Sequence, residues 1–148
     1  MPKSLKEEFR LFCNSKNLNH NQNQILTIKK LQDFYESNFG SSILNIFKKK
    51  EIKKGFYLQG GVGVGKTMIL DFFFNDISQK KLRLHFNEFM LSFHDFVHEN
   101  KNKEDENIID LFVKNLKSKV SLIYFDEFQV TNIVDAMILG KLFDKIFN

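Results

Sequence analysis

Residues 60–67 of this chain read Gly-Gly-Val-Gly-Val-Gly-Lys-Thr, which fits the pattern G-x-x-x-x-G-K-[ST]. Small residues let consecutive backbone N–H groups turn toward an anion, and a helix that follows directs the positive end of its dipole at the same charge. In this pattern Lys66 reaches the β- and γ-phosphates of a nucleotide, and the hydroxyl of Thr67 binds Mg²⁺. The stretch therefore predicts a loop that binds the phosphates of a nucleoside triphosphate.

The residues on either side of this loop support the prediction. The apolar residues 56–58 are typical of a short buried strand, and residues 68–77 have helical periodicity, with Leu70, Phe73 and Ile77 on one face. The order strand, loop, helix distinguishes a phosphate loop from a glycine-rich turn that holds a lysine by chance. We expect the nucleotide to contact Gly60, Gly61, Val62, Gly63, Val64, Gly65, Lys66, Thr67 and Met68.

A second element lies downstream, where residues 120–125 read Val-Ser-Leu-Ile-Tyr-Phe. Such a nearly unbroken apolar run is typical of a strand buried on both faces of a parallel sheet. The run ends in two carboxylates, Asp126 and Glu127. We expect Asp126 to be a metal ligand that holds Mg²⁺ directly or through water. We expect Glu127 to orient the attacking water. The predicted catalytic residues are therefore Glu127 and, in the phosphate loop, Lys66. The alternative is that both acids simply begin a solvated turn.

Length, charge and cysteine content restrict the class of protein. A chain of 148 residues is long enough for one domain with a single core. The formal charge of +4 permits an anionic partner but is weak evidence for one. The single cysteine, Cys13, excludes an intramolecular disulfide, which suits a reducing compartment. Neither a signal peptide nor an apolar stretch of membrane-spanning length is present in this sequence, so we expect a cytoplasmic location.

The remaining periodicity predicts a mainly helical chain with one more strand. We expect helices at residues 4–13, 22–37, 41–49, 88–98, 108–117 and 132–147, and a strand at 82–86. Asn132 is the predicted N-cap of the last helix, with Asp135 in an approximate capping box. On that helix we expect Ile133, Ala136, Met137, Gly140, Phe143 and Phe147 to face inward.

Three further features have a functional and a simpler interpretation. The lysine-rich run at residues 48–54 suits contact with phosphates or nucleic acid, but we favour a solvated connection. His94 and His98 have a spacing that can hold a metal, but no third ligand of suitable spacing follows, so we expect two exposed histidines. His85, near the end of the strand at 82–86, either senses the nucleotide or packs, and the sequence leaves both readings open.

Three segments together, residues 55–68, 81–90 and 125–139, resemble one family. This is the family of the bacterial ZapE cell-division ATPases and their mitochondrial AFG-type relatives, a branch of the AAA+ proteins. The resemblance covers residues 20–147 and keeps the motifs in family order. Three positions depart from the family pattern. Val64 stands where the family usually has Arg or Lys, Asn87 where it has His, and Asn132 where it has Asp. None of these departures touches the predicted phosphate or magnesium groups.

The resemblance implies an α/β fold of the P-loop NTPase type, with a three-layer parallel sheet, in which residues 1–50 form a helical N-terminal extension and residues 51–148 a partial ATPase core. It implies ATP and Mg²⁺ as cofactors, and hydrolysis of ATP to ADP and phosphate coupled to remodelling of a protein partner. It further implies a homo-oligomer in the full-length protein, peripheral membrane association, and a role at the division machinery or in protein quality control at a membrane.

The family pattern also continues beyond Asn148, with a strand that carries a Thr-Ser-Asn sensor, an arginine finger and a C-terminal part. In AAA+ folds the sensor strand lies between the strand before the phosphate loop and the strand that carries the two carboxylates. Unpaired strand edges that should be buried are unfavourable. We therefore expect this chain to be an N-terminal fragment of a longer ATPase, incomplete at its C-terminus, that folds poorly and hydrolyses little ATP.

Two other functions remain open from the sequence. One is a nucleotide-regulated adaptor, similar to a helicase loader, that binds nucleic acid without useful turnover; the ATPase function does not require a nucleic-acid partner. The other is an inactive truncated product. Loss of hydrolysis on changing Glu127 to Gln favours the enzyme, whereas salt-sensitive DNA binding that depends on Lys48–Lys50 favours the adaptor.

Overall fold

The computed structural model describes residues 4–40, 53–100 and 108–148. The chain divides into two compact units, Met1–Ile77 and Ser78–Asn148, and each is described by itself. The helix expected at 41–49 and most of the lysine-rich run lie outside the described residues. The domain boundary expected at residue 50 stays a prediction.

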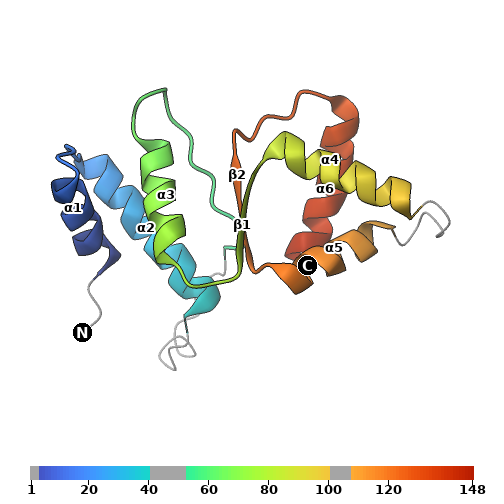
Figure 1. The fold of residues 1–148 in the computed structure, drawn as a ribbon, viewed down its shortest axis with the longest axis horizontal. Helices are drawn as coiled ribbons and strands as arrows, with labels where there is room; N and C mark the ends of the chain where they lie inside the picture. Colours follow the sequence, from blue (N-terminus) through green and yellow to red (C-terminus); the bar gives the residue numbers. More distant parts are fainter. Residues whose placement is uncertain (1–3, 41–52, 101–107) are drawn as a thin grey trace. The chain divides into compact units, whose positions relative to one another are not determined.

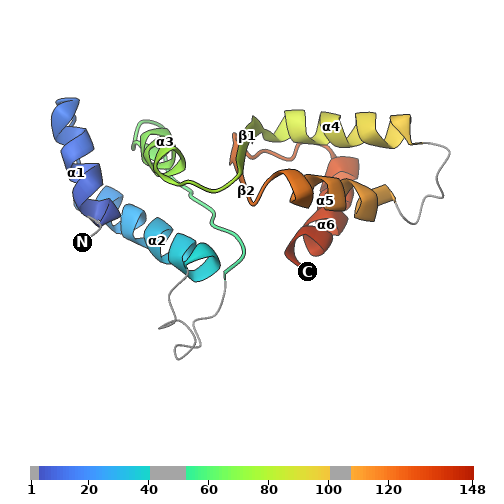
Figure 2. The same ribbon diagram turned by 60° about the horizontal axis from the view of Figure 1, so that its bottom comes forward.

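The first unit contains three described helices, α1 (Leu5–Ser15), α2 (Gln22–Phe39) and α3 (Lys66–Asp76), each close to its predicted range. Helix α1 packs on α2, and α2 packs on α3 (Figure 1). A second view shows the same neighbours (Figure 2). Apolar residues at helical spacing line the contacts, and the ring of Phe9 on α1 meets that of Phe72 on α3 edge-on, with centroids 5.1 Å apart. These contacts place α3, the helix that follows the phosphate loop, against the N-terminal helices.

Cys13 lies on the buried face of α1 and has no exposed surface. Burial raises the pKa of its thiol above the ordinary value, because a thiolate is poorly solvated there. The side chain therefore behaves as a small apolar core residue.

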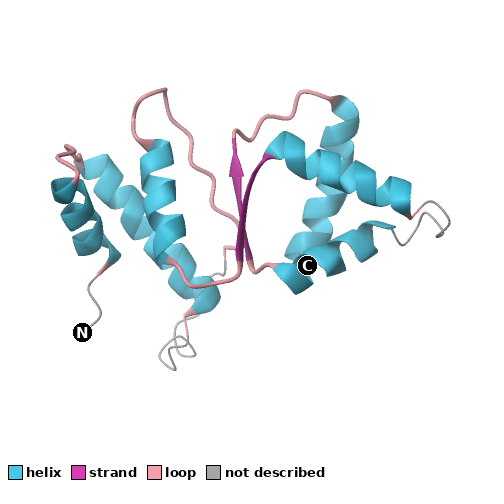
Figure 3. Cartoon of the chain, in the orientation of Figure 1, coloured by secondary structure: helices cyan, strands magenta, loops and turns pink. Residues whose placement is uncertain are grey.

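The strand predicted at residues 56–58 is wrong. Residues 53–65 form an irregular segment that leads into α3, drawn as a loop in Figure 3, and Tyr57 is 72% exposed. A strand is stable only when a neighbour accepts its backbone hydrogen bonds. Among the described residues the sheet has two strands, and both belong to the second unit. Within the described residues of the first unit, the apolar residues before the loop therefore have no strand to pair with.

The second unit contains a parallel pair of strands and three described helices. In chain order these are β1 (Lys81–His85), α4 (Phe86–Glu99), α5 (Ile108–Lys119), β2 (Leu122–Asp126) and α6 (Ile133–Phe147). The register places Arg83 opposite Tyr124 and His85 opposite Asp126. Parallel strands joined through helices are the arrangement expected of an α/β fold. The sheet has two strands in the described residues, so the full three-layer sheet stays a prediction.

The two faces of this small sheet differ in character. Leu84 and Phe125 pack against the apolar core formed with α4, α5 and α6, which lie together on one side of the strands (Figure 2). Because side chains alternate along a strand, Arg83, Tyr124 and Asp126 share the opposite face. Strand β2 is only half-buried along its length, so the expectation that both faces are buried is wrong within this unit. The polar face carries the predicted magnesium carboxylate.

The buried face of α6 also differs from the prediction. The predicted inward residues Ile133 and Met137 are 79% and 67% exposed, and Ala136 and Gly140 are exposed as well. Leu139 and Leu142 are buried instead, with Phe143 and Phe147 half-buried. Helix α6 is apolar around most of its circumference, so its periodicity does not select one face, and packing against α5 decides. The core of this unit comprises Phe86, Phe89, Met90, Phe93, Phe112, Val113, Leu139 and Leu142. None of the helices described is both long and apolar enough to cross a membrane.

Candidate nucleotide-binding site

The phosphate loop has a backbone that requires glycine at two positions. Gly63 and Gly65 have φ values of 79° and 84°, in the left-handed region that side chains disfavour. A Cβ atom added at Gly61 or Gly63 would meet nothing within 4 Å. The backbone at these two glycines therefore faces open space, beside the exposed side chains of Val62 and Val64.

Helix α3 begins directly after the loop with its N-terminus uncapped. Gly65 is the N-cap and offers no side chain, and the first turn contains no acid. By contrast, side chains of Ser4, Asn21 and Asn132 cap helices α1, α2 and α6. The first N–H groups of a helix lack partners within the helix, and its dipole places positive potential there. The start of α3 is therefore suited to an anion.

Lys66 lies at this same point, where the loop becomes helix. Its Nζ donates hydrogen bonds to the carbonyl oxygens of Gly60 at 2.7 Å and Gly61 at 2.6 Å. The ammonium is thus held against the start of the loop. Thr67, the predicted magnesium ligand of this unit, is exposed on the first turn, and Met68 is half-buried beside it. Open backbone, a cation and an exposed hydroxyl together fit a triphosphate with its metal.

Asp126 ends β2 and forms an ion pair with the neighbouring strand. Arg83 donates from Nε to Oδ2 of Asp126 at 2.6 Å. The guanidinium also lies over the ring of Tyr124, 4.9 Å from its centroid. Burial by itself raises the pKa of Asp126, but hydrogen bonds from Arg83 and Tyr124 and the positive charges of Arg83 and His85 outweigh it and lower the pKa below the ordinary value. The carboxylate is therefore ionised and held in one orientation.

Changing Arg83 to Gln is expected to destabilise the chain by about 1 kcal/mol at neutral pH, because the ion pair is partly exposed. Since the pKa of Asp126 is lowered in the folded state, the pair stabilises the fold above the pKa of an unfolded Asp. This contribution is lost as the pH falls through the folded pKa. The difference in thermal midpoint between Arg83→Gln and wild type should therefore shrink in acid.

Thermal unfolding at a series of pH values measures this difference. Arg10→Gln is the matched control, because it removes the other arginine, which is exposed on α1. A midpoint difference for Arg83→Gln that is the same at neutral and strongly acidic pH would contradict the role assigned to the ion pair.

Glu127 follows Asp126 in an unusual conformation. Its φ of 48° is in the left-handed region, where a residue with a side chain is uncommon, and its side chain is exposed. Backbone strain of this kind is found preferentially at functional sites. This conformation occurs directly after the end of β2 at Asp126, the predicted magnesium ligand.

The predicted site residues fall into two groups. Residues 60–68 lie together on the loop and first turn of α3 in the first unit, whereas Asp126 and Glu127 lie together at the end of β2 in the second. Thr67 and Asp126 belong to different units, and a magnesium ion that they share stays a prediction.

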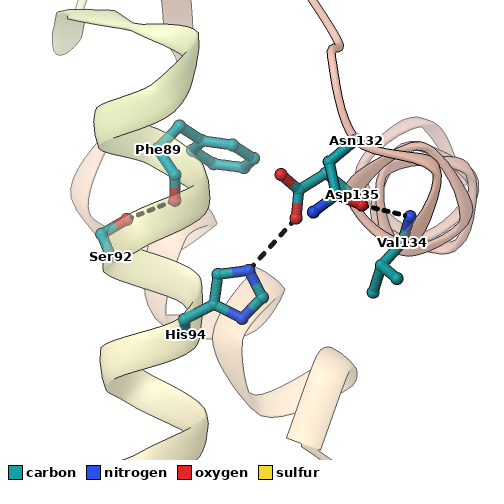
Figure 4. Close-up of polar contacts among 6 residues, drawn as sticks. All are labelled: Phe89, Ser92, His94, Asn132, Val134 and Asp135. Atoms are coloured by element: carbon teal, nitrogen blue, oxygen red, sulfur yellow. Dashed lines mark hydrogen bonds and ion pairs between the residues drawn. The ribbon is translucent and has the colours of Figure 1, made fainter.

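The histidines considered in the sequence have other contacts. His94 Nε2 lies 3.3 Å from Asp135 Oδ1, linking α4 to α6 (Figure 4). Asn132 caps α6 as predicted, accepting a hydrogen bond from Val134 N at 2.8 Å, while Asp135 contacts His94. Within the described ranges, no three His, Cys, Asp or Glu side chains gather closely enough to hold a metal ion. The backbone N–H of His85 donates to Glu88 at 3.0 Å, which begins helix α4.

Two residues near the predicted site were not identified from the sequence. Arg83 holds Asp126, and Gln24 on α2 donates from Nε2 to the carbonyl oxygen of Val64 in the phosphate loop at 3.1 Å. Arg83 carried a weak signal, as one of two arginines in a lysine-rich chain. Gln24 also had a weak sequence signal, since Asn21 and Gln24 have the spacing of a capping box.

Comparison with known proteins gives the same family across nearly the whole chain. The model of the AFG1-like ATPase family matches residues 9–148. Cell division protein ZapE of Escherichia coli is 37% identical over 64% of this chain and 25% of its own length. Lactation elevated protein 1 homolog B of Danio rerio is 38% identical over 64% of this chain and 21% of its own length.

The chain therefore spans a quarter or less of the length of these two curated relatives. No solved structure gives a significant match. The family match covers both the phosphate loop and the carboxylates at the end of β2. The chain belongs to the AFG1-like ATPase family, which includes the ZapE proteins.

Proposed function

We propose that this chain binds ATP with Mg²⁺ and contributes the catalytic residues that hydrolyse ATP to ADP and phosphate. The main support for the proposal is the phosphate loop. There, two glycines with left-handed backbone conformation, an uncapped helix N-terminus and the Lys66 ammonium lie together. Each of these features favours a phosphate anion, and they occur together on consecutive residues.

The residues divide the work by their chemistry. Lys66 and the backbone N–H groups of Gly61–Gly65 stabilise the negative charge of the phosphates. The Thr67 hydroxyl and the Asp126 carboxylate are the oxygen ligands for Mg²⁺. When bound, this ion offsets the charge that develops on the transferred phosphoryl group. Glu127 positions the attacking water.

The energy of hydrolysis is used, in this proposal, to remodel a protein partner, in a longer protein that acts as a homo-oligomer. Support comes from the relationship to ZapE, whose name describes a cell division protein. We propose that the partner belongs to the division machinery. A role in protein quality control is the alternative that the family resemblance allows.

Thermal unfolding with and without Mg-ATP tests the binding step. A ligand that binds only the folded state, at 100 times its Kd, stabilises by about 2.7 kcal/mol, which corresponds to a midpoint about 5–10 °C higher for a chain of this size. Mg-AMP, which lacks the β- and γ-phosphates, should give no comparable shift. If unfolding is not cooperative, equilibrium dialysis with labelled ATP measures binding directly. Absence of saturable ATP binding by both methods would refute the proposal.

A further inference from the structure

The side chain of Gln24 connects two places that are forty residues apart in the sequence. At the start of α2, Gln24 Oε1 accepts from the backbone N–H of Asn21 at 3.0 Å, and Asn21 Oδ1 accepts from Gln24 N at 2.9 Å. The other end of the same amide, Nε2, donates to the carbonyl oxygen of Val64 at 3.1 Å. The capping box thus fixes the Gln24 amide, and the fixed amide holds one peptide unit of the phosphate loop.

The peptide unit that Gln24 holds is the one that joins Val64 to Gly65. In a planar trans peptide the C=O and N–H bonds point in opposite directions. A carbonyl of Val64 held toward α2 therefore directs the N–H of Gly65 away from α2. Gly65 is the last residue before α3 and has a φ of 84°. Its N–H is one of the group that the loop offers to phosphate.

A side chain at Gly65 would also meet the Gln24 amide. A Cβ atom at Gly65 would lie 2.7 Å from Gln24 Nε2, which is shorter than real Cβ contacts allow. The left-handed backbone is therefore what favours glycine before the lysine, and a side chain there would make the Gln24 amide shift. Both observations lie within the first unit, where α2 packs on α3.

We propose that Gln24 is a positioning residue of the phosphate loop, which holds the Val64–Gly65 peptide so that its N–H is directed at the phosphates. The inference rests on the proposed function, since it assumes that the loop binds phosphate. It makes the N-terminal helix α2 part of the nucleotide site. Because Gln24 acts on the loop backbone, it affects the phosphates and not the base.

The test compares Gln24→Met with Asn21→Ala by equilibrium dialysis against Mg-ATP and against inorganic tripolyphosphate. Methionine has a similar length and no amide, so it removes the bond to Val64 and the bond from Asn21 N, while the Asn21 side chain still caps the helix. Asn21→Ala removes the bond from Gln24 N but leaves the bond to Val64. We expect Gln24→Met to lower the affinity for both ligands by about tenfold, which is the effect of one hydrogen bond. Asn21→Ala should change the two affinities by less than about twofold.

If Gln24→Met does not fold, Gln24→Glu keeps the acceptor for Asn21 N but places a carboxylate oxygen at the Val64 carbonyl. Asn23→Glu, at an exposed neighbouring position, is the control for the added charge. The inference would be overturned if Gln24→Met and Asn21→Ala weakened binding equally, or if Gln24→Met weakened the binding of ATP but not of tripolyphosphate. So would wild-type affinity in the Gln24 variants. A wild-type chain that binds neither ligand would instead overturn the proposed function, and the inference with it.

Discussion

Replacement of Lys66 with alanine is expected to weaken Mg-ATP binding by about 100-fold, or about 3 kcal/mol, because the ammonium that we propose to contact the β- and γ-phosphates is lost. Within the part of the chain that the structure describes, this ammonium donates to the carbonyls of Gly60 and Gly61, and the loop backbone at Gly61 and Gly63 faces open space. These two hydrogen bonds are exposed to solvent, so the fold without nucleotide should be nearly as stable as wild type. Equilibrium dialysis measures the affinity, and thermal unfolding measures the stability.

Lys114→Ala is the matched control for this experiment. Lys114 is an exposed lysine on α5, in the second unit, and its removal changes the net charge by the same amount. If Lys114→Ala weakens ATP binding as much as Lys66→Ala does, the attraction between the protein and ATP is a general effect of net charge. That result would contradict a specific role for Lys66.

Replacement of Glu127 with glutamine is expected to lower the rate of ATP hydrolysis by about 10²–10⁴-fold, the typical contribution of a positioned acid–base group. Glutamine has the same shape but cannot accept a proton from water as a carboxylate does. Because Glu127 is exposed and follows the strand, the change should leave ATP binding and folding unaltered. Phosphate release by the longer parent protein and ATP affinity are measured side by side.

Glu99→Gln makes the same chemical change at the exposed end of α4 and should retain full activity. A Glu127→Gln protein that hydrolyses ATP at the wild-type rate would exclude Glu127 as the residue that positions water. Loss of both binding and hydrolysis would instead show that Glu127 supports the site as a whole.

Most helices of this chain were predictable because local patterns determine them. The buried apolar faces of α1 and α2 and the Asn132 cap of α6 depend on residues a few positions apart. Strands β1 and β2 were predicted within one or two residues of their observed limits. The strand at 56–58 failed because a strand needs a partner, and no local pattern specifies one.

The contacts around the candidate site were harder to predict for the same reason. The pairing of Arg83 with Asp126 depends on the register of two strands 43 residues apart. The contact of Gln24 with Val64 depends on how α2 packs beside the loop. The loop residues themselves were identifiable, because glycine and lysine at fixed spacing are needed for the local backbone. Long-range geometry, by contrast, is set by packing that a single sequence does not display.

The buried thiol of Cys13 makes local unfolding of the first unit measurable without any engineered label. Its lack of exposed surface and raised pKa protect it from thiol reagents while α1 stays docked. Alkylation must therefore wait for an opening event, and its rate at saturating reagent reports the frequency of that event. Because the chain has a single cysteine, the signal comes from one site. Helix α1 packs on α2, which carries Gln24, so the alkylation rate reads the dynamics of the helices that hold the phosphate loop.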